Sequence, residues 1–119
     1  LHKRYNQLKE LQAKILSKAE SQITDSKLIF FTYSGNMNLT AEIANQLTYK
    51  NPDKIIIVAF KGAERVTASI RGENIKQLTI NAVKDIEHAT GGGHEFACGA
   101  VIPLDKLDEF KENIEKQIK

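Results

Sequence analysis

The 119-residue chain has little or none of several residue types that mark particular protein classes. It contains one cysteine, two prolines and no tryptophan, and aromatic residues make up 7% of it. A single cysteine excludes an internal disulfide and favours a reducing compartment, so we expect a cytoplasmic protein. The sequence also lacks a signal segment and an apolar run long enough to span a bilayer, so we expect no membrane partner.

The motifs of a self-contained hydrolase are missing as well. The histidines, His2, His88 and His94, lie far apart, the aspartates are scattered, and no Asp-His-His or paired-Asp pattern occurs. Metal-dependent phosphoesterases need such a cluster to hold divalent ions. A P-loop, a dinucleotide fingerprint and a nucleophile elbow are also absent from the sequence. We therefore predict that this chain contributes no catalytic residue and binds no metal or cofactor itself.

Length and charge narrow the class further. A chain of 119 residues fits one domain, and 41% hydrophobic with 27% charged residues is ordinary for a globular protein. A formal charge of +2 is too small to predict nucleic-acid binding by itself. Lysines gather in the first 22 residues, which favours a solvated helix face over a nucleic-acid contact. The chain starts at Leu1 inside a helical pattern, so we expect it to be a piece of a longer protein.

The first half of the chain carries clear helix and strand patterns. Apolar residues at helical spacing over residues 1–23 predict an amphipathic helix, which we interpret as a connector preceding a domain at residues 24–119. Apolar runs at 27–33 and 55–60 predict two strands. A helical pattern over 39–50 lies between them, which implies a parallel pair with a right-handed crossover.

The second half completes an α/β pattern. We expect a hairpin into a strand at 65–71 and a third helix ending near His88. A glycine loop, a short helical turn from about His94 and a strand at 100–102 should follow. A final helix should turn these residues inward: Leu104, Leu107, Phe110, Ile114 and Ile118. We therefore predict a single α/β domain with a mixed sheet of four to five strands flanked by helices, plus the N-terminal connector helix.

The strand at 65–71 has a polar face. Val66, Ala68 and Ile70 alternate with Thr67, Ser69 and Arg71, so the polar side chains share one side of the sheet. They either face solvent at a sheet edge or bind a ligand. Arg71, at the end of the strand, could grip a phosphate with two parallel hydrogen bonds, and Ser69 could donate another.

The segment Gly91-Gly92-Gly93-His94 is the most informative in the chain. Three glycines remove every side chain that would keep an anion from the backbone amides, and histidine, with an unperturbed pKa of about 6.5, adds a proton donor. The simpler interpretation is a helix cap, for which one glycine would suffice. We favour a phosphate site formed by Gly91, Gly92, Gly93 and His94, and we expect nearby Phe96 and Cys98 to be buried core residues.

These residues also carry a family resemblance. The Gly-Gly-Gly-His run, the small residues through Gly99, the apolar strand and the charged last helix resemble the C-terminal domain associated with DHH phosphoesterases. The run Val66 to Gly72 is similar to that family's strand ending in Ser-x-Arg. The resemblance implies that Gly91, Gly92, Gly93 and His94 contact the phosphate, while Ser69 and Arg71 hold the nucleotide backbone.

The same resemblance implies where the chemistry lies. In DHH phosphoesterases an N-terminal domain holds manganese or magnesium, and the C-terminal domain closes over the substrate. The resemblance implies that this chain is the substrate-binding domain of a RecJ-like single-strand nuclease or an oligonucleotide phosphodiesterase. Such a domain would be inactive without the missing DHH domain. Its partners would be that domain and single-stranded nucleic acid or a short oligonucleotide; DNA, RNA, a cyclic dinucleotide and a homodimer all stay open. The alternative is a nucleic-acid-binding or oligomerisation module such as an alanyl-tRNA synthetase tail.

Overall fold

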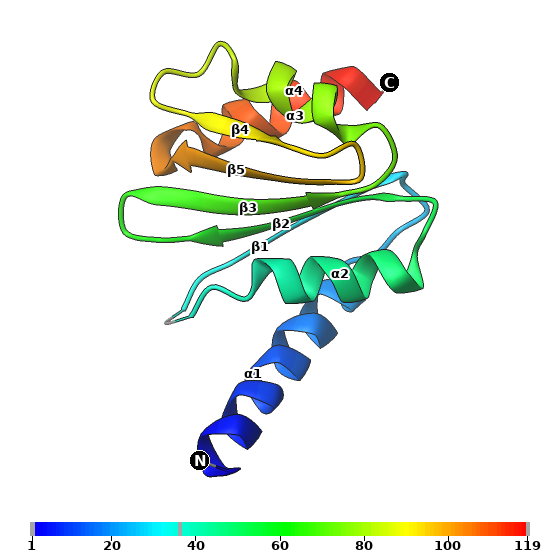
Figure 1. Ribbon diagram of the computed structural model, residues 1–119, viewed down its shortest axis with the longest axis vertical. Coiled ribbons are helices and arrows are strands. Elements are labelled where there is room, and N and C mark those ends of the chain that lie inside the picture. Colours follow the sequence, from blue (N-terminus) through cyan, green and yellow to red (C-terminus); the bar gives the residue numbers. More distant parts are fainter. Residues whose placement is uncertain (1, 36, 119) are drawn as a thin grey trace.

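A computed structural model describes residues 2–35 and 37–118, with side chains from residue 7 onward. Its helices and strands follow one another in the predicted α/β manner (Figure 1). In chain order they are α1 (His2–Ser21), β1 (Leu28–Tyr33), α2 (Thr40–Lys50), β2 (Ile55–Lys61), β3 (Arg65–Arg71), α3 (Ile75–Val83), β4 (Thr90–Gly93), β5 (Ala97–Pro103), a short 3-10 turn (Leu104–Lys106) and α4 (Leu107–Ile118).

The strands form one mixed sheet in the order β1-β2-β3-β5-β4. β1 pairs with β2 in parallel, as the intervening helix predicts, and the other neighbours are antiparallel. β4 is thus an edge strand whose one partner is β5. The prediction of a single α/β domain with a mixed sheet and an N-terminal helix is confirmed.

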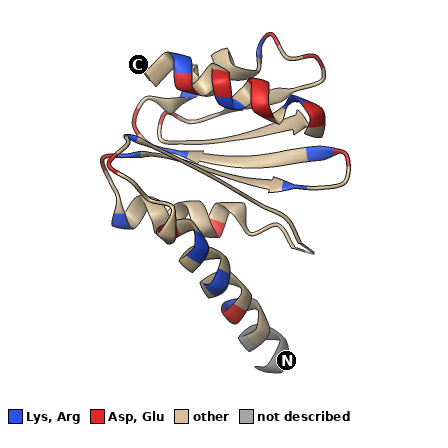
Figure 2. Ribbon diagram, turned by 180° about the vertical axis from the view of Figure 1, so that it is seen from behind, with Lys and Arg blue, Asp and Glu red and all other residues tan. Residues whose placement is uncertain are grey.

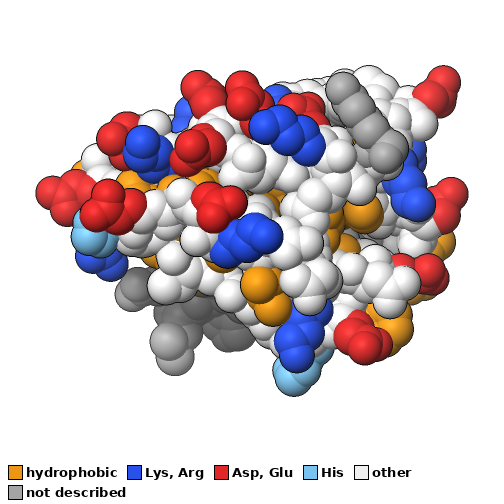
Figure 3. All heavy atoms as spheres, turned by 90° about the horizontal axis from the view of Figure 1, so that it is seen from above, with side chains coloured by type: hydrophobic (Ala, Val, Ile, Leu, Met, Phe, Trp, Pro, Cys, Tyr) orange, Lys and Arg blue, Asp and Glu red, His pale blue; other side chains and the backbone are white. Residues whose placement is uncertain are grey.

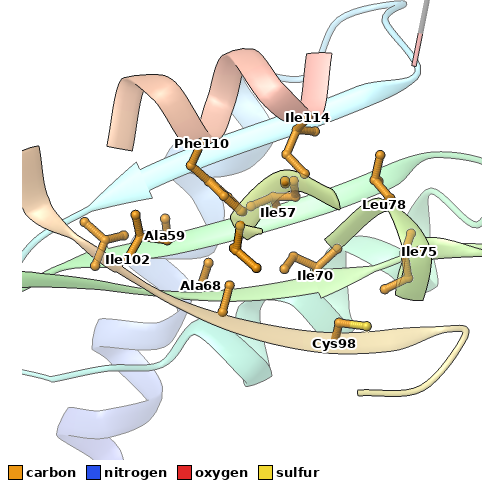
Figure 4. Close-up of a cluster of buried hydrophobic side chains, with 14 of the residues drawn as sticks. Ile57, Ala59, Ala68, Ile70, Ile75, Leu78, Cys98, Ile102, Phe110 and Ile114 are labelled. Carbon is orange, nitrogen blue, oxygen red and sulfur yellow. The ribbon is translucent and has the colours of Figure 1, made fainter. Parts of the chain in front are cut away.

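Helices cover both faces of the sheet. β2 is apolar from Ile55 to Phe60 because it supplies both cores. Ile56 and Val58 pack with α1 and α2, and Ile57 and Ala59 pack with α3 and α4. Figure 4 shows the second core, where Phe110 and Ile114 of α4 reach the sheet residues. On the outer side of α3 and α4, charged side chains of both signs are scattered over the surface, and apolar side chains show only in small patches (Figure 3).

α1 leads away from the sheet. Its Ile15, Leu16 and Ala19 are buried in the core shared with α2, whereas its first turns project beyond the rest of the molecule (Figure 1). The side chains of residues 2–6, at the start of this helix, lie outside the described part of the chain. Across the described part of the chain, none of the helices is long and apolar enough to cross a membrane.

The segment from residue 84 to 104 differs from the prediction. α3 ends at Val83 rather than near His88, the three glycines form β4 instead of a loop, and β5 begins at Ala97 with no helical turn before it. The glycines form a strand because β4 packs closely against α3. A Cβ on Gly91 would lie 3.0 Å from Thr79 Cγ2 of α3. Leu104 was expected inward but is 37% exposed, because it sits in the 3-10 turn that precedes α4.

Thr79 lies beneath β4 with a buried hydroxyl. Its Oγ1 has no hydrogen-bond partner among the described residues, and the side chain is fully buried. Because an unsatisfied buried hydroxyl is destabilising, Thr79→Val should raise the free energy of unfolding by about 1 kcal/mol while keeping the methyl contact with Gly91. Urea denaturation measures this, with exposed Thr90→Val as a control expected to change stability by less than about 0.5 kcal/mol. A loss of stability in Thr79→Val would show that the hydroxyl is satisfied.

Candidate functional site

A strip of bare backbone crosses one face of the sheet. Ser69 of β3 lies opposite Gly99 of β5, which lies opposite Gly92 of β4. Gly99 is exposed, and a Cβ on Gly92 would meet no atom within 4 Å. Gly91 faces α3, so its neighbour Gly92 must face the opposite side, where α2 packs on β2 and β3. We call Ser69, Gly99 and Gly92 the glycine row.

The backbone amides of β4 divide into two sets. His94 N–H donates to the carbonyl of Ala97 at 2.8 Å, so this amide is already paired. Hydrogen-bonded and non-bonded pairs alternate along an antiparallel ladder, which places Gly92 toward β5 and leaves Gly91 and Gly93 with backbone groups facing the free edge. The amides available to an anion are therefore those of alternate residues at the sheet edge.

His94 and Arg71 lie on the same line across the sheet. His94 is exposed at the end of β4, next to Ala97, and Ala97 is paired with Arg71 at the end of β3. Two strand spacings, about 10 Å, therefore separate the backbones of His94 and Arg71. Two long polar side chains at this separation can both reach one phosphate group held between them.

Arg71 is held in place by the protein around it. Its Nε donates to Asn45 Oδ1 at 2.7 Å, and its Nη1 donates to the carbonyls of Ile70 and Cys98 at 3.0 and 3.3 Å. Burial lowers the pKa of Arg71 from its usual value, and Cys98 acts in the opposite direction. The guanidinium remains charged at neutral pH. Of its five donors, the two on Nη2 make no bond within the described part of the chain and are free for a ligand.

Two residues of α2 belong to the site although the sequence pattern gave no sign of them. Thr40 Oγ1 shares a hydrogen bond of 2.8 Å with Ser69 Oγ, and Asn45 holds Arg71. Helix spacing identifies the apolar face of α2 but not the strand that its polar edge touches. Contacts between residues so far apart in the chain depend on where the crossover helix settles on the sheet.

Phe96 is more exposed than the sequence predicts. The prediction of a core residue is wrong, because the side chain is 63% exposed in the turn between β4 and β5. Neighbouring Cys98 is buried, as expected, and its thiol donates to the carbonyl of His94. The backbone of this turn bonds to the chain segment after β3, through the carbonyls of Glu95 and Phe96.

The fold brings the predicted residues together at one region of the sheet. Gly91, Gly92 and Gly93 form the edge strand, His94 and Arg71 flank Ala97, and Ser69 lies one row further along β3. Figure 1 shows the turn after β4 beside the end of β3. Among the side chains described, those of residues 7–35 and 37–118, no three His, Cys, Asp or Glu gather to hold a metal ion.

The arrangement defines a class of domain that presents bare sheet backbone beside an arginine and a histidine. Residues 24–119 match the family described as DHHA1 domain. The chain therefore belongs to the DHHA1 domain family. None of the curated proteins compared with the sequence matches it.

Solved structures share the fold at low sequence identity. RecJ from Thermus thermophilus, in complex with Mg2+, is 17% identical with a TM-score of 0.77 over 98% of this chain and 18% of its own. The C-Ala domain of Aquifex aeolicus alanyl-tRNA synthetase is 15% identical with a TM-score of 0.59, covering 76% of this chain and 86% of that domain.

A third structure is the pGpG-specific phosphodiesterase PggH from Vibrio cholerae. It is 15% identical with a TM-score of 0.60, covering 98% of this chain and 42% of its own. The chain thus spans less than half of PggH and about a fifth of RecJ. At these identities the likeness establishes the fold.

The glycines of β4 differ in how strictly they require glycine. Gly93 has a φ of 145°, and a Cβ there would lie 2.6 Å from the carbonyl oxygen of Ala97, whereas a Cβ on Gly92 meets open space. Gly93→Ala should therefore lower the free energy of unfolding by at least about 2 kcal/mol. Gly92→Ala, the matched control, should change it by less than about 0.5 kcal/mol. Chemical denaturation of both variants measures the difference, and equal losses would contradict the pairing of β4 with β5.

Proposed function

We propose that this chain is the substrate-binding domain of a metal-dependent DHH-family phosphoesterase, a RecJ-like single-strand nuclease or an oligonucleotide phosphodiesterase. The DHHA1 family membership supports the coarser part of this proposal. The observation that carries the finer part is the glycine row, which leaves sheet backbone open beside the charged Arg71.

Each part of the site has a role in holding a phosphodiester. Arg71 supplies its two Nη2 donors and a fixed positive charge, because Asn45 and two carbonyls already orient its guanidinium. The imidazole of His94 adds a donor beside Arg71. At the free edge of β4, the amides of Gly91 and Gly93 are open to the neighbouring phosphate of the same strand. Ser69, fixed by Thr40, lies one row further along the strand for the next part of the nucleotide backbone.

The hydrolytic step lies outside this chain in the proposal. Manganese or magnesium, when bound by a DHH domain, would activate water and screen the phosphate. This chain's own residues bind and orient the substrate, hold the phosphate over the sheet between Arg71 and His94, and leave its far side open to that domain.

Removing Arg71 or His94 tests the site directly. Arg71→Ala should weaken binding of a single-stranded oligonucleotide about 10-fold or more, because it removes charge-assisted hydrogen bonds to phosphate. His94→Ala should weaken binding to a smaller extent. Fluorescence anisotropy with a labelled oligonucleotide measures both variants.

Arg65→Ala is the matched control for charge. Arg65 is exposed at the other end of β3 on the same face, about 20 Å from Arg71 along the strand, so its loss should leave affinity nearly unchanged. Gly92→Val adds a test of the bare backbone, since its side chain should block the glycine row without meeting protein atoms. Equal losses for Arg65→Ala and Arg71→Ala would reduce the effect to net charge and refute the site.

A second candidate is a nucleic-acid-binding module such as a synthetase tail, in which α1 makes the contact. Exposed lysines along α1, among them Lys14 and Lys18, favour it, and Figure 2 shows where basic residues occur along this helix. The C-Ala likeness supports only the shared fold. In this alternative the glycine row would play no part in binding.

Neutralising α1 separates the two candidates. Under our proposal, the double variant Lys14→Gln/Lys18→Gln should change oligonucleotide affinity by less than about 2-fold, because neither lysine belongs to the glycine row. Under the alternative it should bind RNA much more weakly, with a salt-dependence slope reduced by about 1.4, corresponding to two phosphate contacts on a single strand. Binding titrations at several salt concentrations measure both quantities.

A further inference from the structure

An exposed aromatic ring stands at the end of the candidate site. Phe96 is 63% exposed. Single exposed apolar side chains are common, so exposure alone does not mark a binding residue, and the position of Phe96 is what matters. The other large hydrophobic side chains that are exposed in the described residues are Leu11, Tyr49 and Leu104. Phe96 differs from them in lying within the same turn as His94, next to the end of β3.

The turn that carries Phe96 is fastened to the protein. The Phe96 carbonyl accepts a hydrogen bond from Gly72 N–H at 3.2 Å, and the Glu95 carbonyl accepts one from Ile75 N–H at 2.9 Å. His94 N–H donates to Ala97 across the turn at 2.8 Å. The exposed ring therefore stands on a backbone that is fixed from both sides.

Phe96 lies within one nucleotide of the arginine. Its carbonyl bonds to Gly72, the residue after Arg71, so the two backbone segments are one strand spacing apart, about 5 Å. The base of a nucleotide is joined to its phosphate through a single sugar. A phosphate bound by Arg71 therefore places its own base within reach of the turn that carries Phe96.

We propose that Phe96 is a stacking platform for the base of the nucleotide whose phosphate Arg71 binds. This inference rests on the proposed function and narrows it to nucleic acid with unpaired bases, since a duplex keeps its base faces stacked and hidden. Stacking on a phenylalanine ring uses the face that every base possesses, so the preference among base sequences is weak. The ligand class is single-stranded or very short oligonucleotide.

The test compares ligands with and without bases. Phe96→Ala should lower the affinity for a single-stranded tetranucleotide about 5- to 150-fold, as expected for loss of one base stack. The affinity for the same backbone carrying abasic sites, and for inorganic phosphate, should stay as in the unaltered chain. Phe96→Trp should keep tetranucleotide binding, because indole stacks as well.

Controls keep the inference separate from the proposed function. Leu104→Ala removes a partly exposed apolar side chain at the far end of β5 and should leave all affinities unchanged. If Phe96→Ala binds the tetranucleotide normally while Arg71→Ala does not, stacking is refuted and the proposed function stands. Equal weakening of abasic and base-bearing ligands by Phe96→Ala also refutes stacking. If the unaltered chain binds neither oligonucleotide nor phosphate, the proposed function fails, and this inference fails with it.

Discussion

The backbone ladder that joins β3, β5 and β4 is the constraint on which the candidate site depends. No side chain bridges Ser69 to Gly92; only the register of three strands aligns them. That register requires β4 to lie against α3 and close to Ala97, where a Cβ on Gly91 or Gly93 would collide. Gly91 and Gly93 therefore serve the fold first, whereas no close contact requires glycine at 92, and its missing side chain leaves the surface bare.

Arg71 illustrates how the two helical layers contribute unequally to the site. α3 and α4 supply the core on one face of the sheet. On the other face, α2 packs on β2 and β3, and its Thr40 and Asn45 bond to Ser69 and Arg71 of β3. The guanidinium uses its Nε and Nη1 donors on the protein and leaves the two on Nη2 without a partner among the described residues. A ligand thus meets a charge whose orientation is set before binding, which reduces the conformational entropy lost on association.

Parts of this structure could be predicted from the sequence because periodicity reports burial directly. The unbroken apolar run of β2 indicated a strand covered on both faces, and the alternation of β3 placed Ser69 and Arg71 on one side. Gly91 to Gly93 carry no side chains and so show no period, so the sequence predicts a loop where the structure has β4. Phe96 was expected inside because it adjoins buried Cys98, but its turn is oriented by backbone bonds to Gly72 and Ile75 that no local pattern encodes.

The position of β4 at the border of the sheet has a further consequence. Unpaired backbone groups on an outermost strand can recruit strands from other molecules and start aggregation. Here that hazard is limited, because the strand is only four residues long and consists mainly of glycine, which has low β-propensity. The same composition that leaves amides open to a small anion therefore makes this border a poor template for another polypeptide.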